Sequence, residues 1–325
     1  MRSLKKKERD KLIGDFRSGS VAALARLLSL CESESRSRRD LMSSIYPVEN
    51  QPFVLGITGP AGAGKSSLIN RLLFVFRKRF ERIAVLAFDP TSKLTGGAFL
   101  GDRVRMAEHI KDEGVYIRSM ADQGRAGGVG AGIHDTIGLL SAFGFEMVIV
   151  ETVGTGQSES DVRLIADLVL VVLTPGFGDE IQAMKAGILE LGDLFAVNKA
   201  DQPDAERTET EIKASLALGR SQTAEAPPVF ATVATQGRGV VELAGCLLEK
   251  YQELGREGVI DARRSKRVEA HVEEMLKEHC AMLVASEIKA FRTKRAKAAG
   301  RINPYRLAGA LISKIFKAEN NAKKD

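Results

Sequence analysis

The chain has 325 residues, 44% of them hydrophobic and 28% charged, with a formal net charge of +6. A chain of this length and composition supports one large α/β domain with helical additions. Its three cysteines, Cys31, Cys246 and Cys280, are far apart and form no C-x-x-C pair, which argues against a disulfide framework or a zinc site. No apolar run approaches the roughly 20 residues of a membrane span, and the basic N-terminus lacks the apolar core of a signal peptide. We therefore expect a cytoplasmic protein with no membrane partner.

The positive charge gathers in short basic stretches rather than over a whole face. These stretches cover residues 5–9, 36–39, 263–267 and 292–301. They flank expected helices and contain few aromatic side chains that could stack on bases. We therefore expect no nucleic-acid partner.

Apolar runs alternate with helical patterns along most of the chain. An N-terminal helical extension is expected over residues 8–31, and the polar stretch 32–40 leads from it to the first run. The expected strands are 53–58, 83–88, 115–118, 147–151, 168–173, 194–198 and 229–232. Buried strands that alternate with helices predict a mostly parallel central sheet with helices on both faces. A ligand is then expected at the carboxyl ends of the strands.

A phosphate-binding loop follows the first strand. The sequence GPAGAGKS at residues 59–66 fits the pattern G-x-x-x-x-G-K-[ST], and an amphipathic helix is expected over 66–80. The glycines let backbone N–H groups surround a polyphosphate, Lys65 supplies a positive charge, and the Ser66 hydroxyl is placed to bind Mg²⁺. The predicted nucleotide-binding residues of this loop are Gly59, Pro60, Ala61, Gly62, Ala63, Gly64, Lys65, Ser66 and Ser67.

The second strand leads into a loop that contains two carboxylates, Asp89 and Asp102. Together with Arg103 and Arg105 they predict a switch that orders around Mg²⁺ and a nucleoside triphosphate. Asp89 precedes Pro90, so a turn-starting aspartate is the alternative. The two arginines are more often surface groups than transition-state donors, and they are given no role.

A further carboxylate, Glu151, ends the apolar run 147–150. A carboxylate at the end of a buried strand beside a phosphate-binding loop can reach Mg²⁺ directly or through water. Glutamate is longer than the more common aspartate, which favours the water-mediated contact. Gln157 lies two residues later than the glutamine that orients water in small signalling GTPases, so it is not assigned that role.

The expected sixth strand leads into the N-K-x-D pattern of guanine-specific GTPases, formed by Asn198, Lys199, Ala200 and Asp201. A carboxylate at Asp201 can accept hydrogen bonds from both N1–H and the exocyclic amine of guanine, whereas adenine would leave it unpaired. The alternative is a polar helix start, since Asn and Asp also cap helices. The motifs together predict binding of GTP and GDP with Mg²⁺.

Beyond about residue 261 the pattern changes to long helices without strands. One apolar stripe recurs at spacings of three and four residues: Val268, Val272, Met275, Leu276, His279, Met282 and Leu283. Such a stripe can pack on its own domain or on a second copy of the chain. His271 and His279 are interpreted as stripe or surface residues rather than metal ligands.

Several sequence strings resemble the MeaB/ArgK family of P-loop GTPases. They are GPAGAGKSS, DPTSKLTGGAFLGDRVRM, ETVGTGQSES and PGFGDEIQAMKAGILELGDLFAVNKAD, and the resemblance extends over about residues 10–239. Members of this family are chaperones of adenosylcobalamin-dependent acyl-CoA mutases such as methylmalonyl-CoA mutase. The resemblance implies a P-loop NTPase fold, GTP hydrolysis, a mutase partner and a homodimer.

Carried onto this sequence, the resemblance implies specific roles. Lys65, Asp89, Asp102 and Glu151 would be catalytic, and Ser66 with the three carboxylates would surround the metal and the hydrolytic water. A third switch over residues 175–185 would couple nucleotide state to the partner through Asp179, Glu180 and Lys185. The last guanine-contacting loop departs from the family pattern, because Val233 stands where a hydroxyl residue is usual. The N–H of Ala234 is still expected to reach guanine O6.

The sequence therefore predicts an N-terminal helical extension (1–50), a P-loop GTPase domain (51–260) and a C-terminal helical arm for dimerisation (261–325). The expected function is a slow GTPase that gates adenosylcobalamin loading and protects or reactivates a cobalamin-dependent acyl-CoA mutase. A nickel-delivery GTPase is one alternative, although residues 89–157 hold only His109 and His134 and no cysteine. A P-loop kinase or ATPase linked to amino-acid transport is the other, and the N-K-x-D pattern argues against it.

Overall fold

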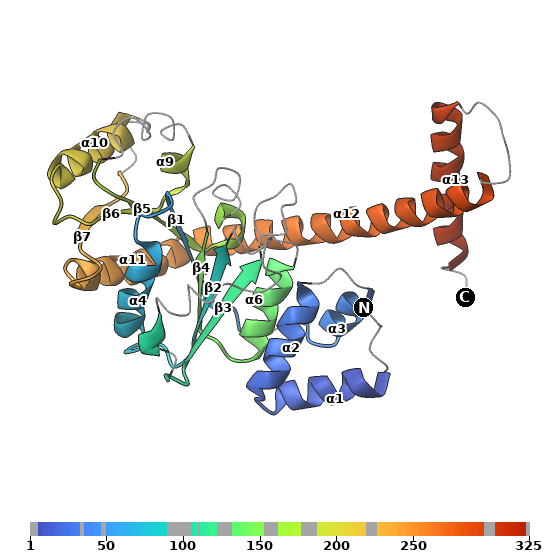
Figure 1. The fold of residues 1–325 in the computed structure, drawn as a ribbon, viewed down its shortest axis with the longest axis horizontal. Coiled ribbons are helices and arrows are strands. Elements are labelled where there is room, and N and C mark those ends of the chain that lie inside the picture. The colour runs from blue at the N-terminus through green and yellow to red at the C-terminus, as the bar shows by residue number, and fades with distance from the viewer. Residues whose placement is uncertain are drawn as a thin grey trace. The chain divides into compact units, whose positions relative to one another are not determined.

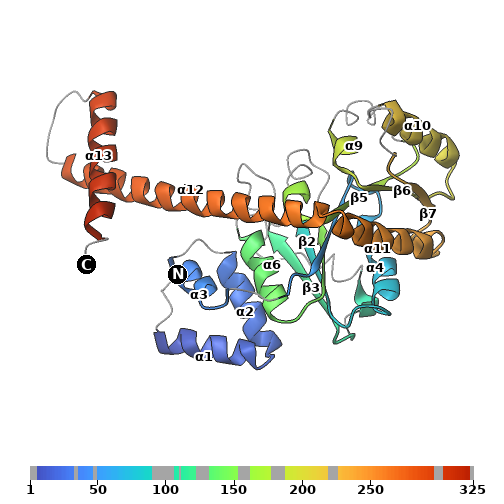
Figure 2. The ribbon, with the colours of Figure 1, turned by 180° about the vertical axis from the view of Figure 1, so that it is seen from behind.

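The computed structural model describes residues 6–32, 36–46, 50–89, 106–109, 111–121, 132–152, 162–176, 187–218, 226–295 and 303–322. The chain forms two compact units, Met1–Arg267 and Val268–Asp325. The first unit holds a central sheet with helices around it (Figures 1 and 2). The second is helical.

The sheet has seven strands, and all their pairings are parallel. The strands are β1 (Phe53–Thr58), β2 (Ile83–Asp89), β3 (Val115–Ala121), β4 (Met147–Glu151), β5 (Leu168–Leu173), β6 (Leu194–Asn198) and β7 (Val229–Thr232). Their order is β3-β2-β4-β1-β5-β6-β7, which places β1 at the centre between β4 and β5. The predicted α/β class and parallel sheet are confirmed. Strand β3 runs three residues further than expected, because its end continues to pair with β2 as far as Asp89 and Ala121.

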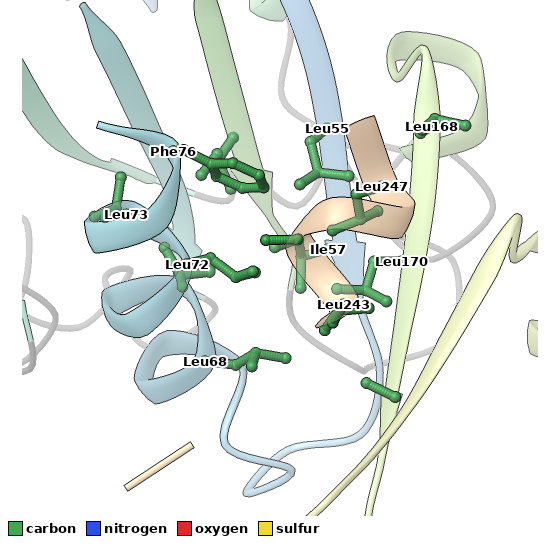
Figure 3. Close-up of a cluster of buried hydrophobic side chains, with 14 of the residues drawn as sticks. Leu55, Ile57, Leu68, Leu72, Leu73, Phe76, Leu168, Leu170, Leu243 and Leu247 are labelled. Carbon is green, nitrogen blue, oxygen red and sulfur yellow. The ribbon is translucent and has the colours of Figure 1, made fainter. Parts of the chain in front are cut away.

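One face of the sheet is covered by α4 (Lys65–Phe76) and α11 (Val240–Arg256). Figure 3 shows leucines of both helices meeting side chains of β1 and β5 in one buried cluster. Its members include Leu55, Ile57, Leu68, Leu72, Phe76, Leu170, Leu243 and Leu247, all 0% exposed. Burying one such side chain is worth about 1.5–3 kcal/mol, so this layer holds the phosphate-binding loop on a rigid base.

Helix α4 ends four residues before the expected end at residue 80. The chain leaves the helix through a tighter turn, in which the N–H groups of Lys78 and Arg79 donate to the carbonyls three residues back, those of Val75 and Phe76. The Arg77 side chain holds the segment that follows, since its Nη1 donates to the carbonyls of Phe80 and Glu81 at 2.7 and 2.6 Å. Its other nitrogens bind the Asp112 carboxylate at 2.8 and 2.9 Å.

The other face is covered by α6 (Ile133–Ala142) together with the N-terminal helices, and by α10 (Ala205–Leu218). The helical extension predicted over 8–31 consists of two helices, α1 (Lys6–Arg17) and α2 (Val21–Cys31). A third helix, α3 (Arg36–Ser43), begins inside the polar stretch expected over 32–40. Gly19 at φ +87° breaks the first helix, and the Ser20 hydroxyl caps the second by accepting from the N–H of Ala23 at 3.3 Å.

Helix α3 forms within the predicted polar stretch because it has a partner in the domain. Arg38 makes a buried ion pair with Asp135 of α6, Nε to carboxylate 3.1 Å, with side chains 8% and 5% exposed. Helix α2 is held in a similar way, since Arg118 of β3 binds the Glu32 carboxylate at 2.7 Å. The N-terminal helices are thus packed against the sheet of the first unit.

The first turns of α12 (Val259–Arg295) are fixed to the first unit by partly buried ion pairs. Asp167, which precedes β5 and is 0% exposed, accepts from Arg264 at 3.0 Å and from Arg267. Arg263 binds Asp193, which precedes β6, at 2.8 Å. Both carboxylates lie at the amino ends of their strands, which is the edge opposite the phosphate-binding loop.

The remaining elements are a short turn of helix at Ala107–His109, α9 (Ile188–Leu191) and α13 (Pro304–Ala322). In the second unit, Lys314 of α13 pairs with Glu287 of α12. The apolar residues Val268, Val272, Leu276 and Met282 are exposed on α12. Among the helices described, none is both long enough and apolar enough to cross a membrane.

Candidate functional site

The phosphate-binding loop joins the central strand β1 to α4 and requires glycine at two positions. Gly59 has φ +137°, and a Cβ there would lie 2.0 Å from the carbonyl oxygen of Val172. Gly64 has φ +86°, and its Cβ would lie 2.3 Å from Nδ2 of Asn198. Only glycine at these two positions therefore lets the loop approach β5 and the Asn198 side chain so closely. The loop ends at the N-terminus of α4, where the first backbone N–H groups and the helix dipole favour an anion.

Lys65 lies folded over this loop. Its Nζ donates to the carbonyl oxygens of Gly59 at 2.7 Å and Pro60 at 2.9 Å, and the residue is 7% exposed. The ammonium group thus sits above the loop at the edge of the sheet where phosphates would bind. A charge in so buried a place acts on a phosphate much more strongly than a charge in water.

Two buried oxygen ligands lie beside the loop. The Ser66 hydroxyl donates to Oε1 of Glu151 at 2.7 Å, and the two residues are 5% and 7% exposed. They come together because β4 pairs with β1 in a register that sets Ile57 opposite Glu151. Hydroxyl and carboxylate oxygens are hard ligands of the type that Mg²⁺ prefers. The two side chains therefore fit the predicted metal, although no group of three or more His, Cys, Asp or Glu residues suited to a metal occurs among those described.

Asn198 connects the phosphate side of the site to its predicted guanine side. Its Nδ2 donates to the carbonyl of Ala63 at 2.9 Å. Its Oδ1 accepts from the N–H of Ala234 at 3.1 Å and from the Thr232 hydroxyl at 3.3 Å. The side chain is 2% exposed, so it bridges three segments inside the protein. Lys199 follows with φ +59°, a left-handed conformation that turns the chain away after β6.

The rest of the N-K-x-D pattern is less buried, since Lys199 and Ala200 are half-buried and Asp201 is exposed. Val233 and Ala234, expected at the last guanine-contacting loop, are 1% and 3% exposed. The N–H of Val233 donates to the Arg238 carbonyl at 3.0 Å. The N–H of Ala234, expected at guanine O6, donates to Asn198 in this structure. The structure therefore brings the loop beside Asn198, while its contact with a base stays a prediction.

Some predicted site residues lie outside the described residues. They are Asp102, Asp179, Glu180 and Lys185, and Arg103, Arg105 and Gln157 also fall there. Asp89 is the last residue of β2, at the same edge of the sheet as the phosphate-binding loop, but its side chain is not among those described. Their roles stay predictions.

Sequence reasoning missed a group of polar residues on and beside α4. Arg71 contacts the carbonyls of Ala234 and Thr235, and Glu108 contacts both Asn70 and Arg71. No motif marks these side chains, because their partners are distant in sequence. Two threonines were also missed. Thr58 ends β1, Thr152 directly follows β4, and their hydroxyl oxygens are 2.9 Å apart.

His109 and Cys31 are poorly placed to bind a transition metal. His109 is 3% exposed and its Nε2 lies 3.0 Å from the carbonyl oxygen of Asn70. Cys31 is buried in the N-terminal helices, and burial raises the pKa of its thiol to about 12. A thiol with that pKa stays protonated at neutral pH and is a weak ligand.

Comparison with known proteins gives a family and a fold. The family model described as "Methylmalonyl Co-A mutase-associated GTPase MeaB" matches residues 24–289. A protein of Pyrococcus abyssi named as a GTPase is 39% identical over 313 residues, covering 94% of this chain and 97% of its own length. A "Methylmalonic aciduria type A homolog, mitochondrial" of Caenorhabditis elegans is 32% identical over 329 residues, covering 94% and 82%.

Among solved structures, one titled "Crystal structure of LAO/AO transport system kinase" is similar with a TM-score of 0.65. It is 22% identical and covers 98% of this chain and 99% of that chain. At that identity the likeness concerns the fold alone, and it agrees with the parallel sheet and the terminal helices described above.

Proposed function

This chain belongs to the MeaB family of methylmalonyl-CoA mutase-associated GTPases, and we propose that it is a GTP-hydrolysing chaperone that gates adenosylcobalamin loading of a partner mutase. In this proposal it also protects or reactivates that mutase, which is a cobalamin-dependent acyl-CoA mutase of the methylmalonyl-CoA type. It works in the cytoplasm, a reducing compartment that suits its free cysteines Cys31, Cys246 and Cys280.

The proposal that the chain binds a nucleotide rests on the hydrogen bonds of the Asn198 side chain. One buried amide contacts both the phosphate-binding loop, at Ala63, and the loop that contains Ala234. A nucleotide that fills this site would have its phosphates at Lys65 and its base near Asp201. The carboxylate of Asp201 would accept two hydrogen bonds from guanine and select it over adenine.

In the proposed mechanism, Lys65 moves its hydrogen bonds from the loop carbonyls to the phosphate oxygens. Its charge would then offset the charge that spreads over these oxygens in the transition state. Ser66 and Glu151 would hold Mg²⁺, which supplies further neutralisation of the phosphates when bound. Asp89 and Asp102 are proposed to orient the metal's water shell and the attacking water. None of these groups is an arginine finger, so intrinsic hydrolysis should be slow, as suits a timed switch.

The partner contacts are proposed at two places. A third switch at residues 175–185, with Asp179, Glu180 and Lys185, would report the nucleotide state to the mutase. Two chains would form a homodimer through the C-terminal arm, a role supported by the exposed apolar residues Val268, Val272, Leu276 and Met282.

We expect purified protein to hydrolyse GTP selectively over ATP, and a purified adenosylcobalamin-dependent acyl-CoA mutase to accelerate this hydrolysis. The matched variant Asp201→Asn keeps the side-chain size but removes one acceptor, so it should lower the GTP preference by roughly 10- to 100-fold. Steady-state phosphate release with each nucleotide measures both effects. GTP turnover that ignores the mutase would move the search to a metal-delivery partner, and preferred ATP turnover would overturn the guanine assignment.

Lys185→Ala should leave GTP affinity nearly unchanged and weaken mutase-stimulated hydrolysis. The reason is that the proposed coupling switch acts on the partner rather than on the nucleotide. Stimulated and basal phosphate release, measured in parallel, separate the two effects. Full stimulation of the variant would remove Lys185 from the coupling mechanism.

A further inference from the structure

Arg71 occupies an unusual position on α4, where its guanidinium faces two other segments of the chain. Nε points to the carbonyl oxygen of Ala234 at 3.3 Å, and Nη2 to that of Thr235 at 3.4 Å. The third nitrogen, Nη1, lies 3.8 Å from the Glu108 carboxylate. Each nitrogen therefore has its own partner, in the forked geometry that only arginine provides.

The segment on the Glu108 side is docked on α4 by further contacts. Nδ2 of Asn70 donates to the Glu108 carboxylate at 2.9 Å. The His109 ring stands 3.0 Å from the Asn70 carbonyl through Nε2 and packs against Phe74, with ring centroids 4.3 Å apart. Met106 is 0% exposed. Residues 106–109 are thus a segment docked on α4. In the sequence they directly follow the loop that contains the predicted switch carboxylates.

The segment on the other side is the loop beside Asn198. Its N–H group at Ala234 donates to the Asn198 side chain, so the loop is held from the strand side. Arg71 holds its carbonyls from the α4 side. The usual hydroxyl residue of this loop is replaced by Val233, whose side chain offers no hydrogen bond. Backbone hydrogen bonds close the loop on itself, from Val233 N–H to the Arg238 carbonyl and from Gln236 N–H to the Val233 carbonyl, both at 3.0 Å. Asn198 and Arg71 add the side-chain contacts that hold this turn from outside.

We propose that Arg71 is a positioning residue for the guanine-binding loop 232–235, and that its contact with Glu108 links this loop to the docked segment 106–109. The inference rests on the proposed GTP site. Arg71 does not touch the nucleotide in this proposal. It sets the position of the backbone that the base contacts, so its loss should weaken guanine recognition much more than phosphate recognition.

The test compares two ligands, GDP and pyrophosphate, by titration calorimetry of the full chain. The Arg71 side chain is 36% exposed, so its hydrogen bonds are only partly shielded from water. Arg71→Ala should therefore lower GDP affinity by about 3- to 10-fold and change pyrophosphate affinity by much less. Arg71→Lys keeps the charge and should recover part of the loss. Arg79→Ala, at an exposed arginine just past α4, is the matched control and should change neither affinity.

The link to Glu108 is tested by a double-mutant cycle with Glu108→Gln. Because Glu108 acts through Arg71, the effects of the two substitutions on GDP affinity should not add. Additive effects would remove the link. Should Arg71→Ala fail to fold, Arg71→Lys and Glu108→Gln carry the same comparison of GDP with pyrophosphate.

Equal losses for GDP and pyrophosphate, or no loss for either, would overturn the role of Arg71 even in a guanine-selective protein. A wild-type chain that binds ADP as tightly as GDP would instead overturn the proposed guanine site, and this inference with it. The wild-type comparison therefore separates the two failures.

Discussion

Replacing Asp167 with alanine should lower the free energy of unfolding of the first unit by about 3 kcal/mol, the lower end of the range for a buried pair, because it leaves two partly buried guanidinium groups without their counter-ion. The carboxylate is 0% exposed and accepts from Arg264, Arg267 and the backbone N–H of Val54, the last at 2.9 Å. Alanine removes all these acceptors at once. The two guanidinium groups and the Val54 N–H would then lose their acceptor at a site that water reaches poorly.

Urea unfolding followed by tyrosine fluorescence measures this change, since Tyr251 stacks on Phe53 in the core of the first unit at a ring distance of 4.0 Å. Asp167→Asn keeps an acceptor for the Val54 N–H but loses the charge, so its loss should be smaller. Arg207→Ala, which breaks an ion pair with Glu211 on the surface of α10, should be indistinguishable from wild type. An Asp167→Ala midpoint equal to that of this control would show that the cluster adds no stability.

Lys65→Ala should lower kcat for GTP by about 10²- to 10³-fold, the usual cost of removing one fixed donor from a site that stabilises developing charge. The reason lies in the burial of the ammonium group over the loop, where no other described lysine or arginine contacts the Gly59 and Pro60 carbonyls. Single-turnover hydrolysis at saturating GTP isolates this effect from binding.

The control for this variant is Lys78→Ala, an exposed lysine two residues past the end of α4, which should keep wild-type turnover. The unfolding midpoint of Lys65→Ala should stay close to that of wild type, because the loop is also fixed by its glycines and by Asn198. A kcat within threefold of wild type would mean that the ammonium does not act on the phosphates.

The sequence predicts the sheet well because each strand is a buried apolar run, and a parallel sheet covered on both faces demands such runs. The sequence does not predict helices whose presence or bounds depend on tertiary contacts. Residues 36–40 are polar yet lie in helix α3, since Arg38 pairs with Asp135 about a hundred residues away and the next two residues, Leu41 and Met42, are buried. Helix α4 ends at Phe76 in a tighter turn, and the residues after it are held by Arg77, whose partner Asp112 is 35 residues away.

The candidate site divides in the same way. The residues of the phosphate-binding loop and of the N-K-x-D pattern are local motifs whose spacing alone predicts a nucleotide. Arg71 has no such local mark, because its partner Ala234 is 163 residues further along the chain. Only the packing of α4 beside the loop after β7 brings the two together.

The amide of Asn198 has a thermodynamic consequence. Because one rigid, buried side chain is bonded to both loops, ordering either loop removes part of the entropy cost of ordering the other. The free energies with which the protein binds the base and the phosphates should then be coupled rather than additive. A guanine nucleotide with a full phosphate chain would be favoured by more than the sum of its parts, and fragments such as guanosine or free phosphate would compete poorly with it.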